Sequence, residues 1–442
     1  MQVSHMLDRL DVAFDDQRLV ASAGLLLPAT LAQHLGVREL IDELVDLGGV
    51  PGSANVGEKA MTVISSVLAG GDCIDDVDAL RSGSSGAVLG HRVAAPSTVG
   101  TFLRAFLWGH ARQLDAVSRE ALRRAWRAGA GPGSEPLTID LDSTICETYG
   151  LLKQGGADFT YTHVRGYHPL LAAAAGSGDV LHSRLRGGSA NSGRGAAGFV
   201  AETVTRVREA GATGELVLRT DSGFYSGKVV RTCRQYDVRF SITVRLSRTL
   251  HRVISEIPEG AWTPIPYFLD GAEVAKTTYT PFSGRDAKPV RLIVRRVRPT
   301  PGSQLALEGI LFTHHAFITD RDGATLELEA DHRRHAEVEN TIRDLKEGVA
   351  LNHMPSGRFG ANAAWLALNV LAHNLVRWVT RLGLSDLLLR TKTVRARHFS
   401  VPGRLARSGR RTLLHLPAEW PWAEAFVAAL LRLRALLVPA PA

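Results

Sequence analysis

Two apolar stretches of this chain read as β-strands that end in aspartate. In the first, LTIDLDS at 137–143, Asp140 and Asp142 lie two positions apart, so both side chains point to one face of the strand. The second, at 215–223, reaches Asp221, and Gly223 permits a sharp turn directly after it. Because ligands of open α/β sheets bind at the carboxyl ends of strands, the sequence predicts carboxylates side by side at one sheet edge.

A third acidic residue, Glu339, lies in a segment with helical periodicity at 331–349, DHRRHAEVENTIRDLKEGV. Apolar residues recur there at steps of three and four and predict a face that packs on a core: Val338, Ile342, Leu345 and Val349. A second face carries polar residues: His332, His335, Glu339, Arg343 and Lys346. One interpretation is a solvated face with a Glu339–Arg343 ion pair. Beside the two strand ends, Glu339 would instead supply a third carboxylate.

Three converging carboxylates repel one another and raise each other's pKa unless a cation lies between them. Mg²⁺, with Mn²⁺ as a substitute, takes oxygen ligands and keeps waters for a phosphate substrate. Two such ions can activate a hydroxyl and stabilise the leaving oxygen of a phosphoryl displacement. We therefore predict Asp142, Asp221 and Glu339 as catalytic and metal-binding residues. Asp140 is the alternative to Asp142 at the first position.

The surrounding pattern predicts an α/β fold whose mixed sheet is flanked by helices. Strands at 167–175 and 179–185 follow the first strand, and helices at 187–211 and 228–236 alternate with the later strands. The order β-β-β-α-β-α-β begins antiparallel and continues parallel. We expect five segments: a helical DNA-binding domain at 1–130, the first part of the catalytic domain at 135–250, a β-rich insertion at 251–330, catalytic-domain helices with Glu339 at 331–385, and a basic C-terminal region at 386–442.

The charge balance of the chain favours an anionic partner. The 442 residues carry a formal net charge of +8, mostly from arginine, whose planar guanidinium suits bidentate phosphate contacts. The stretch 390–411 contains eight Lys/Arg residues and no acidic residue. We predict double-stranded DNA as the partner, with contacts from these residues: Arg333, Arg334, Arg343, Lys346, Arg404, Arg407, Arg410 and Arg411.

Other classes of function find little support. Cys73, Cys146 and Cys233 lie far apart without CxxC spacing, which disfavours a disulfide scaffold and suits a reducing cytoplasm. The sequence shows neither a secretory leader pattern nor an apolar run of about 18 residues, so we expect a cytoplasmic protein without a membrane span. It also lacks the GK[ST] of a phosphate-binding loop and the GxSxG of a serine nucleophile.

Three motifs together resemble the DDE transposases of bacterial insertion sequences, in the branch with a YREK-type signature. They are IDLDST around Asp142, LRTDSGF around Asp221 and HRRHAEVENTIRDLKEG around Glu339. The run HPLLAAAAGSGDVLHSRLRGGSANSGRGA is similar to the corresponding region of such transposases. The resemblance implies an RNase H-like fold with a β-rich insertion before the Glu339 helix. It also implies a homodimer that pairs two DNA ends in a synaptic complex.

The resemblance further implies Mg²⁺-dependent cut-and-paste transposition. Water nicks the transposon end, and the freed 3′-hydroxyl attacks a phosphodiester, in the related branch through a hairpin. Asp142, Asp221 and Glu339 match the catalytic acids, and Lys346 matches the signature lysine, a phosphate contact. His332 and His335 stand where the signature has tyrosine and arginine. A neutral imidazole cannot reproduce the bidentate grip of arginine on phosphate.

Several alternatives stay open. His332 and His335 could form a zinc cluster with His314 and His315, although helical zinc motifs usually have longer spacings. Trp262 could stack on a flipped base. The chain could also be a catalytically inactive, transposase-derived DNA-binding protein or an RNase H-like host nuclease. Short inverted repeats beside the reading frame would favour a mobile element.

Overall fold

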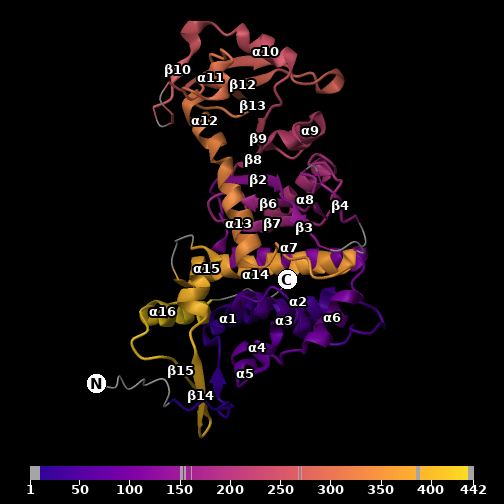
Figure 1. Ribbon diagram of the computed structural model, residues 1–442, viewed down its shortest axis with the longest axis vertical. Helices are drawn as coiled ribbons and strands as arrows, with labels where there is room; N and C mark the ends of the chain where they lie inside the picture. The colour runs from indigo at the N-terminus through magenta and orange to yellow at the C-terminus, as the bar shows by residue number, and fades with distance from the viewer. Residues whose placement is uncertain are drawn as a thin grey trace, which may run out of the picture.

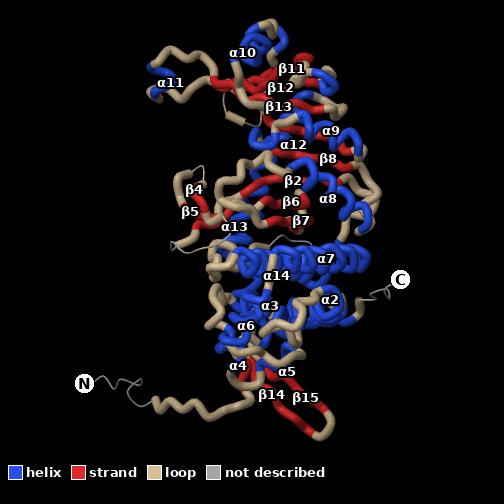
Figure 2. The backbone as a smooth tube through the Cα atoms, turned by 90° about the vertical axis from the view of Figure 1, so that its right-hand side faces the viewer, coloured by secondary structure: helices blue, strands red, loops and turns tan. Residues whose placement is uncertain are grey.

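The computed structural model describes residues 10–149, 153, 156–160, 162–266, 268–269, 271–384 and 389–436. Parts of the predicted segments 1–130, 135–250, 251–330, 331–385 and 386–442 therefore lie outside the described residues. The molecule is elongated (Figure 1). The N-terminal helices lie towards one end, the strands that precede Glu339 lie at the other, and the middle of the sheet lies between them (Figures 1 and 2).

A nine-stranded mixed sheet runs through the upper part of the molecule, in the order β10-β11-β12-β13-β9-β8-β2-β6-β7. Its first five strands along the chain are β2 (Leu137–Ser143), β6 (Leu170–Ala174), β7 (Val180–Arg184), β8 (Leu216–Thr220) and β9 (Val238–Thr243). Strands β2, β8 and β9 run parallel to one another, whereas β6 pairs antiparallel with both β2 and β7. The predicted mixed α/β fold is thereby confirmed, and it is RNase H-like.

The strands of the predicted insertion extend this sheet instead of forming a separate one. They are β10 (Thr263–Pro264), β11 (Glu273–Tyr279), β12 (Val290–Val297) and β13 (Thr313–Thr319). Strand β13 pairs antiparallel with β9, and Phe317 lies opposite Thr243. The pairing satisfies backbone groups that an edge strand β9 would leave open. Helix α10 (Arg248–Ser255) lies at this end of the molecule (Figure 1).

Helices cover the sheet and form most of the chain before it. The helices before the sheet are α1 (Leu26–His34), α2 (Val37–Leu44), α3 (Val56–Ala69), α4 (Val77–Arg81), α5 (Ser85–Leu89), α6 (Pro96–Ala105) and α7 (Trp108–Ala125). Helices α8 (Ala196–Glu209) and α9 (Gly227–Gln235) connect sheet strands. Helix α14 (Phe359–Val379) lies beside α7, between the N-terminal helices and the sheet (Figures 1 and 2).

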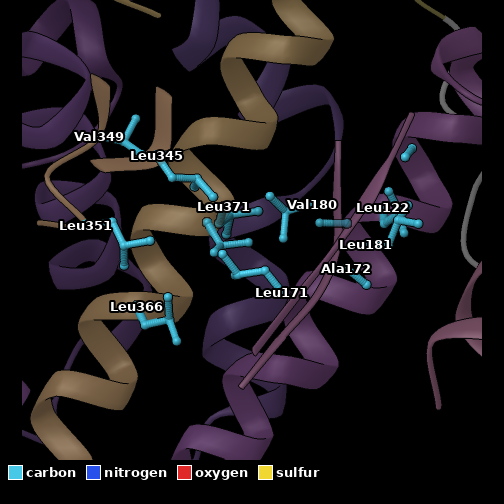
Figure 3. Packing of buried hydrophobic residues seen from close by; sticks show 14 of the residues in the cluster. Leu122, Leu171, Ala172, Val180, Leu181, Leu345, Val349, Leu351, Leu366 and Leu371 are labelled. Carbon is cyan, nitrogen blue, oxygen red and sulfur yellow. The ribbon is translucent and has the colours of Figure 1, made fainter. Parts of the chain in front are cut away.

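One hydrophobic core joins the helical and sheet regions. Leu122 of α7, Leu171 of β6, Val180 of β7 and Leu371 of α14 all belong to the same buried cluster (Figure 3). Leu345 joins them from the segment that carries Glu339 (Figure 3). Burial of such side chains is the main stabilising contribution to folding. No helix of the described residues, α14 included, is long and apolar enough to span a membrane.

The segment 331–349 is not the single helix that its periodicity predicts. Helix α12 (Thr325–Arg333) ends there, a 3₁₀ turn follows at Arg334–Glu337, and α13 (Val338–Gly348) then begins. A 3₁₀ turn advances three residues per turn and not 3.6, so residues before and after it no longer share one helix face. The predicted polar face from His332 to Lys346 is therefore wrong as a continuous surface.

The C-terminal region returns to the N-terminal helices. Strands β14 (Gly403–Ser408) and β15 (Arg411–His415) form a hairpin, and β14 also pairs with β1 (Leu19–Val20). Helix α16 (Ala423–Arg434) packs against α1. The hairpin lies beyond the N-terminal helices, at the end of the molecule opposite the insertion strands (Figures 1 and 2).

Candidate active site

Asp142 and Asp221 lie side by side at the carboxyl ends of two adjacent parallel strands, β2 and β8. Leu141 of β2 lies opposite Thr220 of β8 in the parallel register, and each aspartate is the next residue along its strand direction. The Asp221 carboxylate accepts a hydrogen bond of 2.9 Å from the backbone N–H of Gly223, which begins the turn. The sheet itself therefore brings together two acids that are far apart in the sequence.

Gly223 permits a close approach behind Asp221. A Cβ atom at this position would lie 2.8 Å from Cβ of Ser192, so a larger residue would force the two loops apart. The Ser192 hydroxyl lies 3.1 Å from that of Ser143, the last residue of β2. These contacts fix the loop before α8 against both strand ends.

The pKa of Asp142 depends on the charges of the other two predicted acids, Asp221 and Glu339. The pKa of Asp142 is raised to about 6, chiefly by burial and also by the charges of Asp221 and Glu339, against the lowering effects of the Ser143 N–H and of His335. A carboxylate in this position gains from a nearby cation. Three oxygen donors of this kind fit the ligand preference of Mg²⁺ or Mn²⁺.

The three predicted acids form an open group and not a closed cage. Among the described residues, two sets of side chains bring three ligand atoms within 4.8 Å of one another: Asp72, Cys73 and Asp76, and Asp115, His182 and Glu202. The predicted triad is not one of them. Glu339 is exposed in the first turn of α13, and carboxylates without a counter-ion repel each other.

Asp140 has a different environment from Asp142, although both lie on the same face of β2. Asp140 is buried, and Arg219 donates to both of its oxygens, from Nε at 2.6 Å and from Nη2 at 2.8 Å. Arg219 lies opposite Asp140 in the β2–β8 register. With both carboxylate oxygens already engaged by Arg219, Asp140 is poorly placed as a metal ligand.

The two histidines at signature positions make internal contacts. His335 Nδ1 lies 3.0 Å from the Asp140 carboxylate. His332 is buried and stacks on Phe317 with ring centroids 4.0 Å apart. Both of its nitrogens reach hydroxyls, with Nδ1 2.7 Å from Ser241 and Nε2 2.9 Å from Thr243. His332 therefore joins α12 to strands β9 and β13 of the sheet through both of its nitrogens and its ring.

These contacts disfavour the alternative zinc cluster, because the hydroxyls already occupy the nitrogens of His332. His314 lies elsewhere, beside His251 and Trp262. Trp262 itself is covered by the guanidinium of Arg296, 4.2 Å from the ring centroid. A base could therefore not stack on that face of the Trp262 ring without displacing the arginine.

The predicted DNA-binding residues near Glu339 lie in several different environments. Arg343 is exposed on α13, and Lys346 reaches back to donate to the Ile145 carbonyl at 2.9 Å. Arg333 lies over the Phe268 ring, 4.4 Å from its centroid. Arg334 is exposed and donates to Glu337 at 3.0 Å. Only Arg343 and Lys346 share a helix with Glu339, because the 3₁₀ turn separates the other two.

The remaining predicted DNA contacts lie on the β14–β15 hairpin. Arg404, Arg407, Arg410 and Arg411 are exposed, and Arg404 donates to Asp16 at 3.0 Å. The N-terminal helices lie between this hairpin and the elements that carry the acids, β2, β8 and α13, so the hairpin does not contribute to the acid site (Figure 1). Any DNA that reaches both must run along the molecule.

Sequence reasoning missed the partners of Asp140. Arg219 also donates to the backbone carbonyl of Asp331, and Arg321 binds the Asp331 carboxylate. This chain of charges is buried at Arg219 and Asp140 and half-buried at Asp331 and Arg321, and it ties the start of the Glu339 segment to β2 and β8. An arginine inside the apolar strand LVLRT was the available signal, since a buried guanidinium needs an anionic partner.

The RNase H-like sheet thus carries Asp142 and Asp221 at two adjacent strand ends, and Glu339 lies on a helix that follows. The family described as "Transposase DDE domain group 1" matches residues 4–438, and the chain belongs to this family. No curated protein matches the chain. Among solved structures, a piggyBac transposase synaptic complex with hairpin DNA is similar, with 13% identity and a TM-score of 0.45. The match covers 86% of this chain and 80% of that one.

Proposed function

We propose that this transposase excises and inserts an insertion sequence by metal-dependent hydrolysis and strand transfer. The observation that carries the proposal is the junction of Asp142 and Asp221 at the ends of paired strands, with the pKa of Asp142 raised by burial and by both other acids. Such a site is suited to hold divalent cations against a phosphodiester.

Asp142, Asp221 and Glu339 would hold Mg²⁺ or Mn²⁺, which supplies charge stabilisation and an activated hydroxyl during phosphoryl displacement. The rest of the site acts through position. Arg219 holds Asp140 and the Asp331 backbone, so β2, β8 and the start of the Glu339 segment keep one geometry. Arg343 and Lys346, one and two turns after Glu339, are placed to contact a DNA phosphate.

Double-stranded DNA at the transposon ends is the proposed substrate, and a homodimer would pair two ends. The net charge of +8 and the exposed hairpin arginines support an extended DNA path. This path runs from the acid site along the N-terminal helices to the β14–β15 hairpin.

The test is an end-cleavage assay on DNA that carries the inverted repeats flanking the reading frame. We expect wild-type protein to nick this DNA in Mg²⁺ and not in EDTA, and Asp221→Ala to be inactive while binding the DNA as well as wild type. Equal nicking by both proteins would refute the catalytic assignment. DNA binding without nicking by wild type would identify the inactive, DNA-binding alternative, and nicking without dependence on the repeats would identify a host nuclease.

A further inference from the structure

A second group of ligating side chains lies on the other face of the sheet from the candidate active site. It comprises Asp115 of α7, His182 of β7 and Glu202 of α8, whose ligand atoms lie within 4.8 Å of one another. His182 lies opposite Ala172, and Ala172 lies opposite Leu141. Side chains alternate along a strand, so His182 shares the face of Leu141, not that of Asp142. The group is thus separate from the triad.

The imidazole of His182 is held in one orientation. Its ring stacks on Phe199, with centroids 3.9 Å apart and an interplanar angle of 5°. Its Nδ1 lies 3.1 Å from the Thr203 hydroxyl, which donates its own hydrogen to the Phe199 carbonyl at 2.7 Å. The hydroxyl oxygen must therefore accept from Nδ1–H. In this tautomer, Nε2 carries a lone pair and no hydrogen.

That lone pair points at two negative charges. The His182 side chain is fully buried and its Nε2 has no hydrogen-bond partner among the residues that the structure describes, with Asp115 Oδ1 at 3.7 Å and Glu202 Oε2 at 3.6 Å. Burial, together with Arg206 and Arg184, holds the pKa of His182 well below its ordinary value, so a proton on Nε2 is disfavoured. A buried lone pair that faces two carboxylates without a cation is costly.

The separations suit a metal ion better than hydrogen bonds. Distances of 3.6 and 3.7 Å are too long for hydrogen bonds from an imidazole nitrogen. Tetrahedral Zn²⁺ with bonds of about 2.0–2.1 Å separates its ligand atoms by roughly 3.3 Å. The separations of Asp115 Oδ1 and Glu202 Oε2 from His182 Nε2 exceed this value by only a few tenths of an ångström.

Arginines hold both carboxylates from outside. Arg206 binds Asp115 through Oδ2, which leaves Oδ1 directed at His182. Arg184 donates to Glu202 Oε2 at 2.5 Å. Hydrogen bonds of this kind orient ligating carboxylates in metal sites. Their positive charge also opposes a cation, so we expect weaker binding than at a cysteine-rich structural site.

We propose that Asp115, His182 and Glu202 bind a divalent transition metal, Zn²⁺ foremost, which links α7, β7 and α8. One imidazole nitrogen and two carboxylate oxygens favour Zn²⁺ over Mg²⁺, which prefers oxygen ligands alone. The fourth position would hold water. The site is structural: it joins the edge strand of the sheet to helices from two separate parts of the chain.

The test compares zinc binding by full-length wild type, His182→Gln and Asp221→Ala, each stripped with a chelator. Equilibrium dialysis against Zn²⁺, with a large excess of Mg²⁺ to fill the triad, should give one equivalent for wild type and Asp221→Ala. His182→Gln should bind at least about 100-fold more weakly, because glutamine lacks the imidazole ligand. Zinc should also raise the thermal midpoint of the first two proteins and leave that of His182→Gln unchanged.

Asp115→Asn provides a second variant that keeps the shape of the side chain, in case His182→Gln does not fold. Co²⁺ in place of Zn²⁺ should give an intense visible band in wild type that is lost in Asp115→Asn. Equal zinc stoichiometry in wild type and both variants, or folded wild type that binds no zinc, would overturn the proposal. Loss of DNA cleavage in Asp221→Ala with zinc retained separates this site from the proposed function.

Discussion

Asp140 and Asp142 lie on the same face of one strand, yet their environments are opposite. Asp140 is paired at both oxygens with the guanidinium of Arg219. Asp142 is half-buried and accepts a hydrogen bond from the Ser143 N–H instead, and its pKa is raised to about 6 by partial burial and by neighbouring acids. The charge of Asp140 stabilises the fold through its ion pair with Arg219. The charge of Asp142 stays available for a cation, as is common for carboxylates with perturbed pKa values at reaction sites.

The largest effect we expect is on catalysis at Asp142. Replacing Asp142 by asparagine keeps the shape but removes a metal-binding charge, so cleavage should fall by at least about 10³-fold, which is about 4 kcal/mol of transition-state stabilisation. The stability of the metal-free protein should stay equal or rise, because the change removes a half-buried charge that Asp221 and Glu339 repel. Nicking rates and urea unfolding measure the two effects. A variant that nicks at the wild-type rate would place the first ligand elsewhere.

Asp140→Asn and Arg219→Met should show the reverse pattern, a loss of stability. Each single change leaves the charge of the other residue buried without its partner, which lowers the free energy of unfolding by about 3–5 kcal/mol. The double replacement Asp140→Asn/Arg219→Met should cost clearly less than the sum of the two single changes. Urea unfolding measures all four proteins of this cycle.

Arg239→Met is the matched control for that cycle. Arg239 is also on a sheet strand and faces Glu215 at 3.6 Å, but both side chains are about half exposed. Its loss should therefore cost less than about 1 kcal/mol. Equal costs at Arg219 and Arg239 would show that the buried pair contributes no more than a surface one.

The raised pKa of Asp142 also predicts how stability depends on pH. The folded carboxyl titrates near 6 and the ordinary value is 3.8, so the folded state binds the proton more tightly. This contribution to stability is fully present below the unfolded pKa, declines as pH rises from about 4 to 6, and is lost above. The decline should reach up to about 3 kcal/mol in metal-free protein.

Urea unfolding across this pH range, without metal, should show that decline in wild type and not in Asp142→Asn. Added Mg²⁺ should restore stability above pH about 6, because a cation offsets the repulsion among the ionised acids. Parallel pH profiles of the two proteins would show that the Asp142 carboxyl does not titrate differently in the folded state.

The fold was predictable because strand periodicity and strand-end residues are local signals. LTIDLDS and LVLRTDSG are short apolar strands, and their parallel pairing follows from the α8 connection between them. The extension of the sheet by β13 was not predictable. Pairing between β9 and β13 depends on an edge that becomes visible only once the central strands are assembled.

The environment of the site was less predictable than its acids. His332 has the spacing of a polar face residue, yet the 3₁₀ turn after Arg333 directs it into Ser241, Thr243 and Phe317. Periodicity assumes 3.6 residues per turn and cannot foresee such a break. Arg219 was overlooked because its partner, Asp140, is remote in the chain and meets it only through the β2–β8 register.

The smallest effect we expect is at the β14–β15 hairpin, far from the acids. Replacing Arg407, Arg410 and Arg411 together by alanine removes three exposed charges, so the slope of log K against log salt should fall by about 2.7 if all three contact phosphates. Cleavage of saturating DNA should be unchanged. Binding isotherms at several salt concentrations measure the slope.

Arg119→Ala, which removes a half-exposed arginine paired with Glu209, is the control and should leave the slope unchanged. An unaltered slope in the triple variant would show that bound DNA does not contact the hairpin arginines.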